Sequence, residues 1–78
     1  MVKINLELMG SLADYLPDAK NGIAKISLEK GSSIADLLVR LKIKRKVIVS
    51  VNGEEEKELE YMLSDGDDII VFTVMSGG

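Results

Sequence analysis

The stretch from residue 65 to residue 78 constrains the fold more than any other part of the chain. It opens with the turn residues Asp65-Gly66-Asp67 and continues as an apolar run over residues 69–74 that is rich in β-branched residues and holds no Pro. Such a run is typical of a strand buried in the middle of a sheet. The stretch closes with Ser76-Gly77-Gly78, where the glycines have no core to fill. The sequence therefore predicts a buried last strand that leads into a bare backbone tail.

We expect Gly78 to be a free chain end and its carboxylate to be the working group of the protein. Glycine has no Cβ, so a Gly77-Gly78 tail can lie extended in a narrow channel of a partner enzyme, with its terminal carbonyl open to attack from either face. Simple fraying of terminal residues is the plain alternative for the same two glycines. No packing residues follow Met75, so we predict a flexible tail over about residues 75–78.

The composition lacks the residue types that most often act in catalysis, Cys and His. The 78 residues include no Cys and no His, which excludes disulfides, thiolate or imidazole metal sites and histidine-activated nucleophiles. A formal charge of −3 and only two Tyr and one Phe argue against a nucleic-acid partner. No run approaches the roughly 20 apolar residues that span a bilayer, and no signal-peptide layout precedes the first strand pattern. We expect one cytoplasmic domain, residues 1–78, that binds no nucleic acid, membrane, metal or cofactor by itself.

Hydrophobic periodicity predicts the secondary structure of the first half of the chain. Apolar residues alternate with polar ones over residues 2–8, which indicates a half-buried strand, and residues 23–28 form a second strand pattern. Between them, residues 10–17 carry apolar residues at helical spacing and end at Pro17, so we expect one or two helical turns. Ser33 is a predicted N-cap with Asp36 in the capping-box position. The helix that follows has an apolar stripe formed by Ile34, Leu37, Leu38 and Leu41.

The second half of the chain completes a β-grasp order of elements. The β-branched residues in 47–51 indicate a third strand, and Asn52-Gly53 is a strong hairpin turn signal. The acidic run 54–58 is expected to form a short, charged edge strand beside it. The predicted fold is therefore α+β: a ubiquitin-like β-grasp with a mixed five-stranded sheet and one main helix on one face, its first and last strands parallel at the centre.

One helix leaves one sheet face uncovered, and the last strand carries apolar side chains there. If Ile69, Val71 and Thr73 face the helix, the opposite face holds Ile70, Phe72 and Val74. A contiguous apolar patch usually marks an interaction site. We expect Ile70, Phe72, Val74 and Met75 to contact a partner beside the tail. The alternative is that the 10–17 segment folds over this face and hides it.

Two charged stretches, residues 40–46 and 65–68, have simpler explanations than a docking patch or a calcium site. The cations Arg40, Lys42, Lys44, Arg45 and Lys46 complement the negative end of the helix, and a docking patch for an acidic partner is the alternative. The acidic residues at 65–68 lack the spaced oxygen ligands and distal Glu of a calcium loop, so a plain turn is expected.

These features together resemble the MoaD/ThiS family of ubiquitin-like sulfur carriers, of the molybdopterin synthase small subunit type. The most specific matches are Val51-Asn52-Gly53-Glu54, the Asp65-Gly66-Asp67 turn, Phe72 and Gly77-Gly78 at the spacing of the family. The segment Met9 to Leu16 looks like the helical insertion of the molybdopterin synthase small subunit. The tail after Phe72 lacks the proline common in that type and is closer to the thiamine type.

The resemblance implies a specific mechanism and set of partners. An E1-like adenylyltransferase would bind the domain and use its own ATP and magnesium to convert the Gly78 carboxylate into an acyl-adenylate. A sulfur donor enzyme would then displace AMP and leave a thiocarboxylate. That sulfur would pass to a cofactor precursor held by the large subunit of molybdopterin synthase. For thiamine, the corresponding partner would be thiazole synthase.

Three other functions stay open from the sequence. The chain could carry sulfur for thiamine or another sulfur-containing product. It could be a ubiquitin-like protein modifier that is joined through Gly78 to a lysine by an isopeptide bond. It could also be an interaction module with no chemistry at its end.

Overall fold

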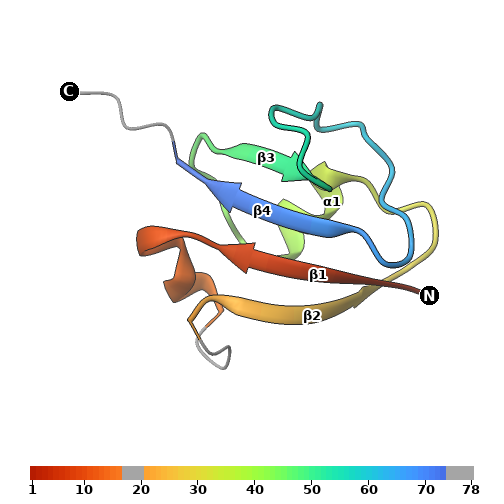
Figure 1. Cartoon of the computed structure of the whole chain (residues 1–78), viewed down its shortest axis with the longest axis horizontal. Helices are drawn as coiled ribbons and strands as arrows, with labels where there is room; N and C mark the ends of the chain where they lie inside the picture. Colours follow the sequence, from red (N-terminus) through yellow and green to blue (C-terminus); the bar gives the residue numbers. More distant parts are fainter. Residues whose placement is uncertain (17–20, 74–78) are drawn as a thin grey trace.

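The computed structural model describes residues 1–16 and 21–73 of the chain. Its elements follow in the order β1 (Val2–Leu8), η1 (Gly10–Tyr15), β2 (Ile23–Leu28), α1 (Ile34–Arg40), β3 (Ile48–Val51) and β4 (Asp68–Phe72) (Figure 1). Pro17 and residues 74–78 lie outside the described residues, so the predicted tail does too. In the described ranges, no helix is both long and apolar enough to cross a membrane.

One four-stranded sheet with the order β2-β1-β4-β3 forms the body of the fold. β1 and β4 lie parallel at its centre, and β2 and β3 pair antiparallel with them on the two sides (Figure 1). Alternation in β1 produces the predicted half-buried strand, because Ile4, Leu6 and Leu8 are each only 1% exposed. The parallel first and last strands at the centre of the sheet, together with a single main helix, are the predicted β-grasp arrangement.

The helix α1 begins at a complete capping box. The backbone N–H of Asp36 donates to Ser33 Oγ at 3.2 Å, and the N–H of Ser33 donates to Asp36 Oδ2 at 2.9 Å. The short Asp side chain therefore reaches the N-cap backbone as a Glu would, and its charge lies at the positive end of the helix. The predicted stripe is buried at Ile34, Leu37, Leu38 and Leu41, and it packs on the sheet.

The predicted fifth strand over residues 54–58 is wrong for the described chain. Glu54 makes one isolated bridge with Val51, and the N–H of Lys57 donates to the Val49 carbonyl at 3.0 Å, but no ladder forms. Glu56 adopts a φ of +60°, which is incompatible with extended backbone. The closely spaced glutamates add a preference against strand structure. The segment instead forms a loop along the outer edge of β3.

The segment after β1 forms the short helical turn that the sequence predicts. η1 is a 3-10 helix whose Leu12 is completely buried in the core, while Tyr15 and Leu16 pack against that core as partly buried side chains. The N–H of Met9 donates to the Val71 carbonyl at 3.0 Å, which extends the pairing of β1 with β4 to the start of η1.

The turn before β4 is held to the start of β1. Gly66 has a φ of +87°, and its N–H donates to the Lys3 carbonyl at 2.7 Å. The N–H of Lys3 donates in return to Asp65 Oδ1 at 2.8 Å. A left-handed backbone at this position suits glycine, which has no Cβ to clash. The acidic side chains of this plain turn therefore act as hydrogen-bond acceptors that place β4 in the centre of the sheet.

Candidate functional site: the helix-free face of the last strand

Only part of the predicted site lies within the described residues. Ile70 and Phe72 belong to β4, whereas Val74, Met75, Ser76, Gly77 and Gly78 lie outside the described chain. The roles predicted for all seven residues stay predictions. The described face of β4 just before the tail is the part of the site that can be built from structure.

Neighbouring residues of β4 face opposite sides of the sheet. Ile69 is 1% exposed and Val71 is completely buried in the core beneath α1. Ile70 and Phe72 are half-buried on the face without the helix, as predicted from the alternation of a strand. Thr73, which was expected to face the helix, is not among the buried core residues and lies at the end of the uncovered face. β4 thus presents two large apolar side chains directly before the tail.

Cross-strand register decides which residues surround these two side chains. On β3, Ser50 pairs with Ile70, and Ile48 pairs with Phe72. On β1, Glu7 pairs with Ile70. Alternation along β1 places Lys3, Asn5 and Glu7 on this face, so β1 contributes polar side chains beside the apolar ones of β4.

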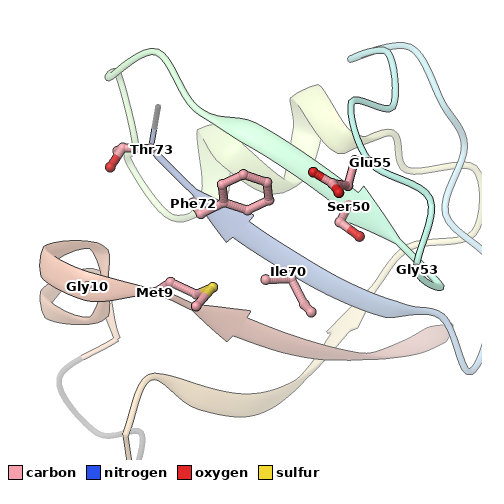
Figure 2. A pocket seen from close by; sticks show the side chains of 8 residues that line it. All are labelled: Met9, Gly10, Ser50, Gly53, Glu55, Ile70, Phe72 and Thr73. Atoms are coloured by element: carbon pink, nitrogen blue, oxygen red, sulfur yellow. The ribbon is translucent and has the colours of Figure 1, made fainter. Parts of the chain in front are cut away.

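A hollow of about 520 Å³ opens on this face (Figure 2). Its floor and walls come from four parts of the chain: Met9, Gly10, Ser50, Gly53, Glu55, Ile70, Phe72 and Thr73. Of these residues, only Ile70 and Phe72 were predicted as site residues. The others become neighbours through strand register and through the loop after β3, which a local sequence pattern does not reveal. The exposed Met9 after an alternating strand was the one available signal.

The described part of the segment that could have hidden this face, residues 10–16, does not cover it. Within residues 10–16, Leu12 turns into the core, and Gly10 contributes only an edge of the hollow. Met9 remains 49% exposed, and its side chain lies near Ile70 and Phe72 in Figure 2. Within the part of the chain that the structure describes, the two β4 side chains are therefore left available to another surface.

The loop after β3 carries one ion pair and one carboxylate that lines the hollow. Lys57 Nζ lies 2.9 Å from Glu54 Oε1 and 5.2 Å from the centre of the Tyr61 ring. The hydrogen bond that Lys57 Nζ donates to the Glu54 carboxylate raises the pKa of the Lys57 ammonium above its usual value. Glu55, the next residue along, lines the hollow. In the described residues, acidic, Cys and His side chains form no group of three or more that could hold a metal ion.

Comparison with known proteins places this arrangement in a family. The family model described as the ThiS family matches residues 7–78, which include the hollow, β4 and both final glycines. The chain belongs to the ThiS family. The resemblance to MoaD/ThiS-type proteins that its motifs indicate is thereby confirmed.

Solved structures confirm the ubiquitin-like β-grasp fold. Small archaeal modifier protein 1 of H. volcanii superposes with a TM-score of 0.75 at 16% identity, over 94% of this chain and 98% of that one. A putative molybdopterin converting factor, subunit 1, from Pyrococcus furiosus reaches 0.76 at 21% identity, with the same coverage of 94% and 98%. A ubiquitin of Caldiarchaeum subterraneum reaches 0.62 at 11% identity, over 99% and 98%. At these identities the likeness establishes the fold.

One curated protein is also similar to a large part of the sequence. A tyrosine–tRNA ligase of Cronobacter sakazakii is 36% identical over 73% of this chain. The chain spans only 16% of the length of that ligase. The match therefore concerns a segment of the larger protein and does not bring its activity to this chain.

Proposed function

We propose that this protein is a sulfur carrier that holds sulfur as a thiocarboxylate on Gly78. The observation that carries the proposal is the match to the ThiS family through residue 78, because it includes the Gly77-Gly78 pair that would carry the chemistry. The chain holds no Cys or His, so sulfur on the main-chain carboxyl group would need no side-chain thiol.

The chemistry requires two successive substitutions, the first at the α-phosphorus of ATP and the second at the carboxyl carbon of Gly78. The Gly78 carboxylate attacks the α-phosphate of ATP, which forms an acyl-adenylate and releases pyrophosphate. Sulfide, delivered by a donor enzyme, then attacks the acyl carbon. The carbon–sulfur bond forms as the bond to AMP breaks, and the product is a thiocarboxylate with AMP and a proton. Adenylation makes this possible because AMP leaves far more readily than a carboxylate oxygen.

The contribution of this chain is to present the tail. ATP, magnesium and the activating groups belong to an E1-like adenylyltransferase, since the chain lacks the usual general base and thiolate. Ile70 and Phe72 would bind that partner through the helix-free face. Phe72 is the last residue of β4 and the tail follows soon after it in the sequence, so docking of this face would direct Gly78 toward the active site of the partner.

For the pathway, we propose molybdopterin synthesis, with this chain as the small subunit of molybdopterin synthase. The fold likeness to a putative molybdopterin converting factor subunit and the helical turn η1 after β1 support this choice. The sulfur acceptor would then be a precursor held by the large synthase subunit. Thiamine synthesis, with thiazole synthase as partner, is the alternative within the carrier class.

A protein modifier is the second candidate from a different class. Two of the similar solved structures are a small archaeal modifier protein and a ubiquitin. In that function, the amine of a lysine rather than sulfide would attack the Gly78 acyl-adenylate or a later thioester, and an isopeptide bond would result.

Intact-mass spectrometry tests the proposal. The chain is co-expressed with an E1-like adenylyltransferase and a sulfur donor, beside matched variants that lack Gly77-Gly78 or carry one added alanine after Gly78. We expect the mass of wild type to rise by the exchange of one oxygen for one sulfur, and both variants to stay unchanged. Conjugates of higher mass that depend on Gly78 would instead establish a modifier. If the wild-type mass is unchanged and the variant without both glycines keeps full function, the protein is an interaction module with no chemistry at its end.

The acceptor pathway is tested separately with the loaded protein. Thiocarboxylated chain is mixed with the large molybdopterin synthase subunit and its precursor, or with thiazole synthase and its substrates. Loss of the thiocarboxylate mass in the first mixture alone supports the molybdopterin assignment. Loss in the second mixture alone moves the protein to thiamine synthesis.

A further inference from the structure

The hollow on the helix-free face is apolar inside and acidic at one rim. Met9, Ile70 and Phe72 provide its apolar surface. Ser50 and Gly53 add little side-chain volume, so space remains between the two β4 side chains and Glu55 (Figure 2). Glu55 is the single charged residue that lines the hollow in the described chain. Such a shape suits an apolar side chain with a positive charge beside it.

No contact inside the described chain uses the carboxylate of Glu55. Its neighbour Glu54 is paired with Lys57 at 2.9 Å, whereas Glu55 forms no ion pair within residues 1–16 and 21–73. Glu7 adds a second carboxylate to the same face, because it lies cross-strand from Ile70 on the side of β1. The densest group of cations, in residues 40–46, belongs to the end of α1 and its connection to β3 and does not line the hollow.

We infer that the hollow takes an apolar side chain of the activating partner and that Glu55 pairs with an Arg or Lys next to that side chain. This inference rests on the proposed function, since the partner is the enzyme that activates Gly78. It adds the chemistry of the surface that the partner must present: an apolar anchor with an adjoining cation. A purely apolar partner surface would gain nothing from the charge of Glu55, and an acidic partner surface would be repelled by it.

The rim charge would fix how the domain sits on its partner. Ile70 and Phe72 alone form a patch that tolerates rotation of the partner, because apolar contact is not directional. A charge pair at one rim selects one orientation and accelerates encounter. Orientation matters here because the chain leaves β4 at Thr73, beside the hollow, and the tail must enter the active site from that point.

Binding kinetics with charge variants test the inference. The probe is an E1-like adenylyltransferase encoded in the same genome, measured by surface-immobilised binding at about 0.05 M and about 0.5 M salt, where the Debye length differs about threefold. We expect Glu55→Lys to weaken binding roughly tenfold at low salt, chiefly through the association rate, and to lose less at high salt. Glu55→Gln should show a smaller loss of the same kind.

Glu60→Lys is the matched control. Glu60 is an exposed residue of the same loop that does not line the hollow, and its substitution changes the net charge by the same amount. Equal weakening by both lysine variants would show an effect of net charge alone and would overturn the inference. Unchanged melting curves for both variants would show that binding, not folding, is measured.

A charge swap and the mass assay complete the test. Replacing the facing Arg or Lys of the partner by Glu should restore binding of Glu55→Lys and weaken binding of wild type. Failure of every cationic position around the docking site to do so would overturn the pairing.

The binding and mass assays together separate this inference from the proposed function. If wild type is loaded with sulfur but Glu55→Lys binds as Glu60→Lys does, only this inference fails. If wild type binds with the predicted charge dependence but is never loaded, only the proposed function fails. If wild type does not bind the adenylyltransferase, both fail.

Discussion

Asn52 and Asp68 are joined by a reciprocal pair of hydrogen bonds. The N–H of Asp68 donates to Asn52 Oδ1 at 2.8 Å, and the N–H of Asn52 donates to the Asp68 carbonyl at 2.8 Å. Asn52 Nδ2 also donates to Asp67 Oδ1 at 2.9 Å, and that carboxylate is only 6% exposed. One turn residue therefore holds the end of β3 against the start of β4, the strand that carries the proposed docking residues.

Substitution of Asn52 should separate its side-chain bonds from its backbone conformation. Asn52 has a φ of +50°, which Gly adopts without strain and Ala does not. Asn52→Gly removes the two side-chain bonds to Asp67 and Asp68 but keeps the backbone bond to the Asp68 carbonyl, and it should lower the free energy of unfolding by about 1–3 kcal/mol. Asn52→Ala should lower it by about 1 kcal/mol more, because its Cβ is strained in the left-handed region. Urea unfolding measures both values. A Gly variant as stable as wild type would show that these bonds contribute nothing net.

The helix cap gives a second test of local structure. Ser33→Ala removes the acceptor for the N–H of Asp36 and should lower the free energy of unfolding by about 1 kcal/mol. Ser32→Ala is the control, because Ser32 Oγ donates to the Glu29 carbonyl at 2.7 Å and does not cap the helix. Thermal unfolding followed by circular dichroism compares the two. Equal losses would mean that the capping box does not stabilise α1.

Hydrophobic periodicity predicted the parts of the fold that are set by burial. The alternation in β1 and the stripe from Ile34 to Leu41 each specify which side chains must leave water, and the structure buries them. The predicted edge strand is wrong because the Asn52-Gly53 turn does not by itself require a paired strand after it. Turn chemistry determines the reversal of the chain but not the pairing that follows, and the left-handed φ of Glu56 interrupts extended backbone in the glutamate-rich segment.

The candidate site was predictable only where it lies on one strand. Ile70 and Phe72 follow from the alternation of β4 and from having a single helix to cover the sheet. Ser50 and Glu55 could not be found in this way. They are 15 to 22 residues away from Ile70 and Phe72 along the chain and join the site through the register of β3 with β4 and the path of the following loop.

Ile69 and Ile70 form a matched pair on opposite faces of β4. Ile69 is buried in the core, so Ile69→Ala should lower the free energy of unfolding by about 2–5 kcal/mol. That is a large share of the roughly 5–15 kcal/mol that stabilises a typical domain. Ile70→Ala removes the same atoms from a half-buried position and should cost about 1 kcal/mol, because less apolar area returns to water. Chemical unfolding of both variants decides the point. Equal losses would place Ile70 in the core.

Phe72 should matter more for binding than for folding. It is half-buried, lines the hollow and pairs with Ile48 on the uncovered face, so Phe72→Ala leaves the packing under α1 intact. Aromatic side chains at the centre of an interface often contribute about 2 kcal/mol or more, so affinity for the E1-like adenylyltransferase should fall roughly 30-fold or more. Calorimetry with the partner and a melting curve of the free chain measure the two effects.

Val71→Ala, at a fully buried neighbour, is the control: it should lower the melting temperature more than Phe72→Ala and affect binding less. A Phe72→Ala variant that melts as early as Val71→Ala yet binds the partner normally would assign Phe72 to the core and remove it from the docking surface.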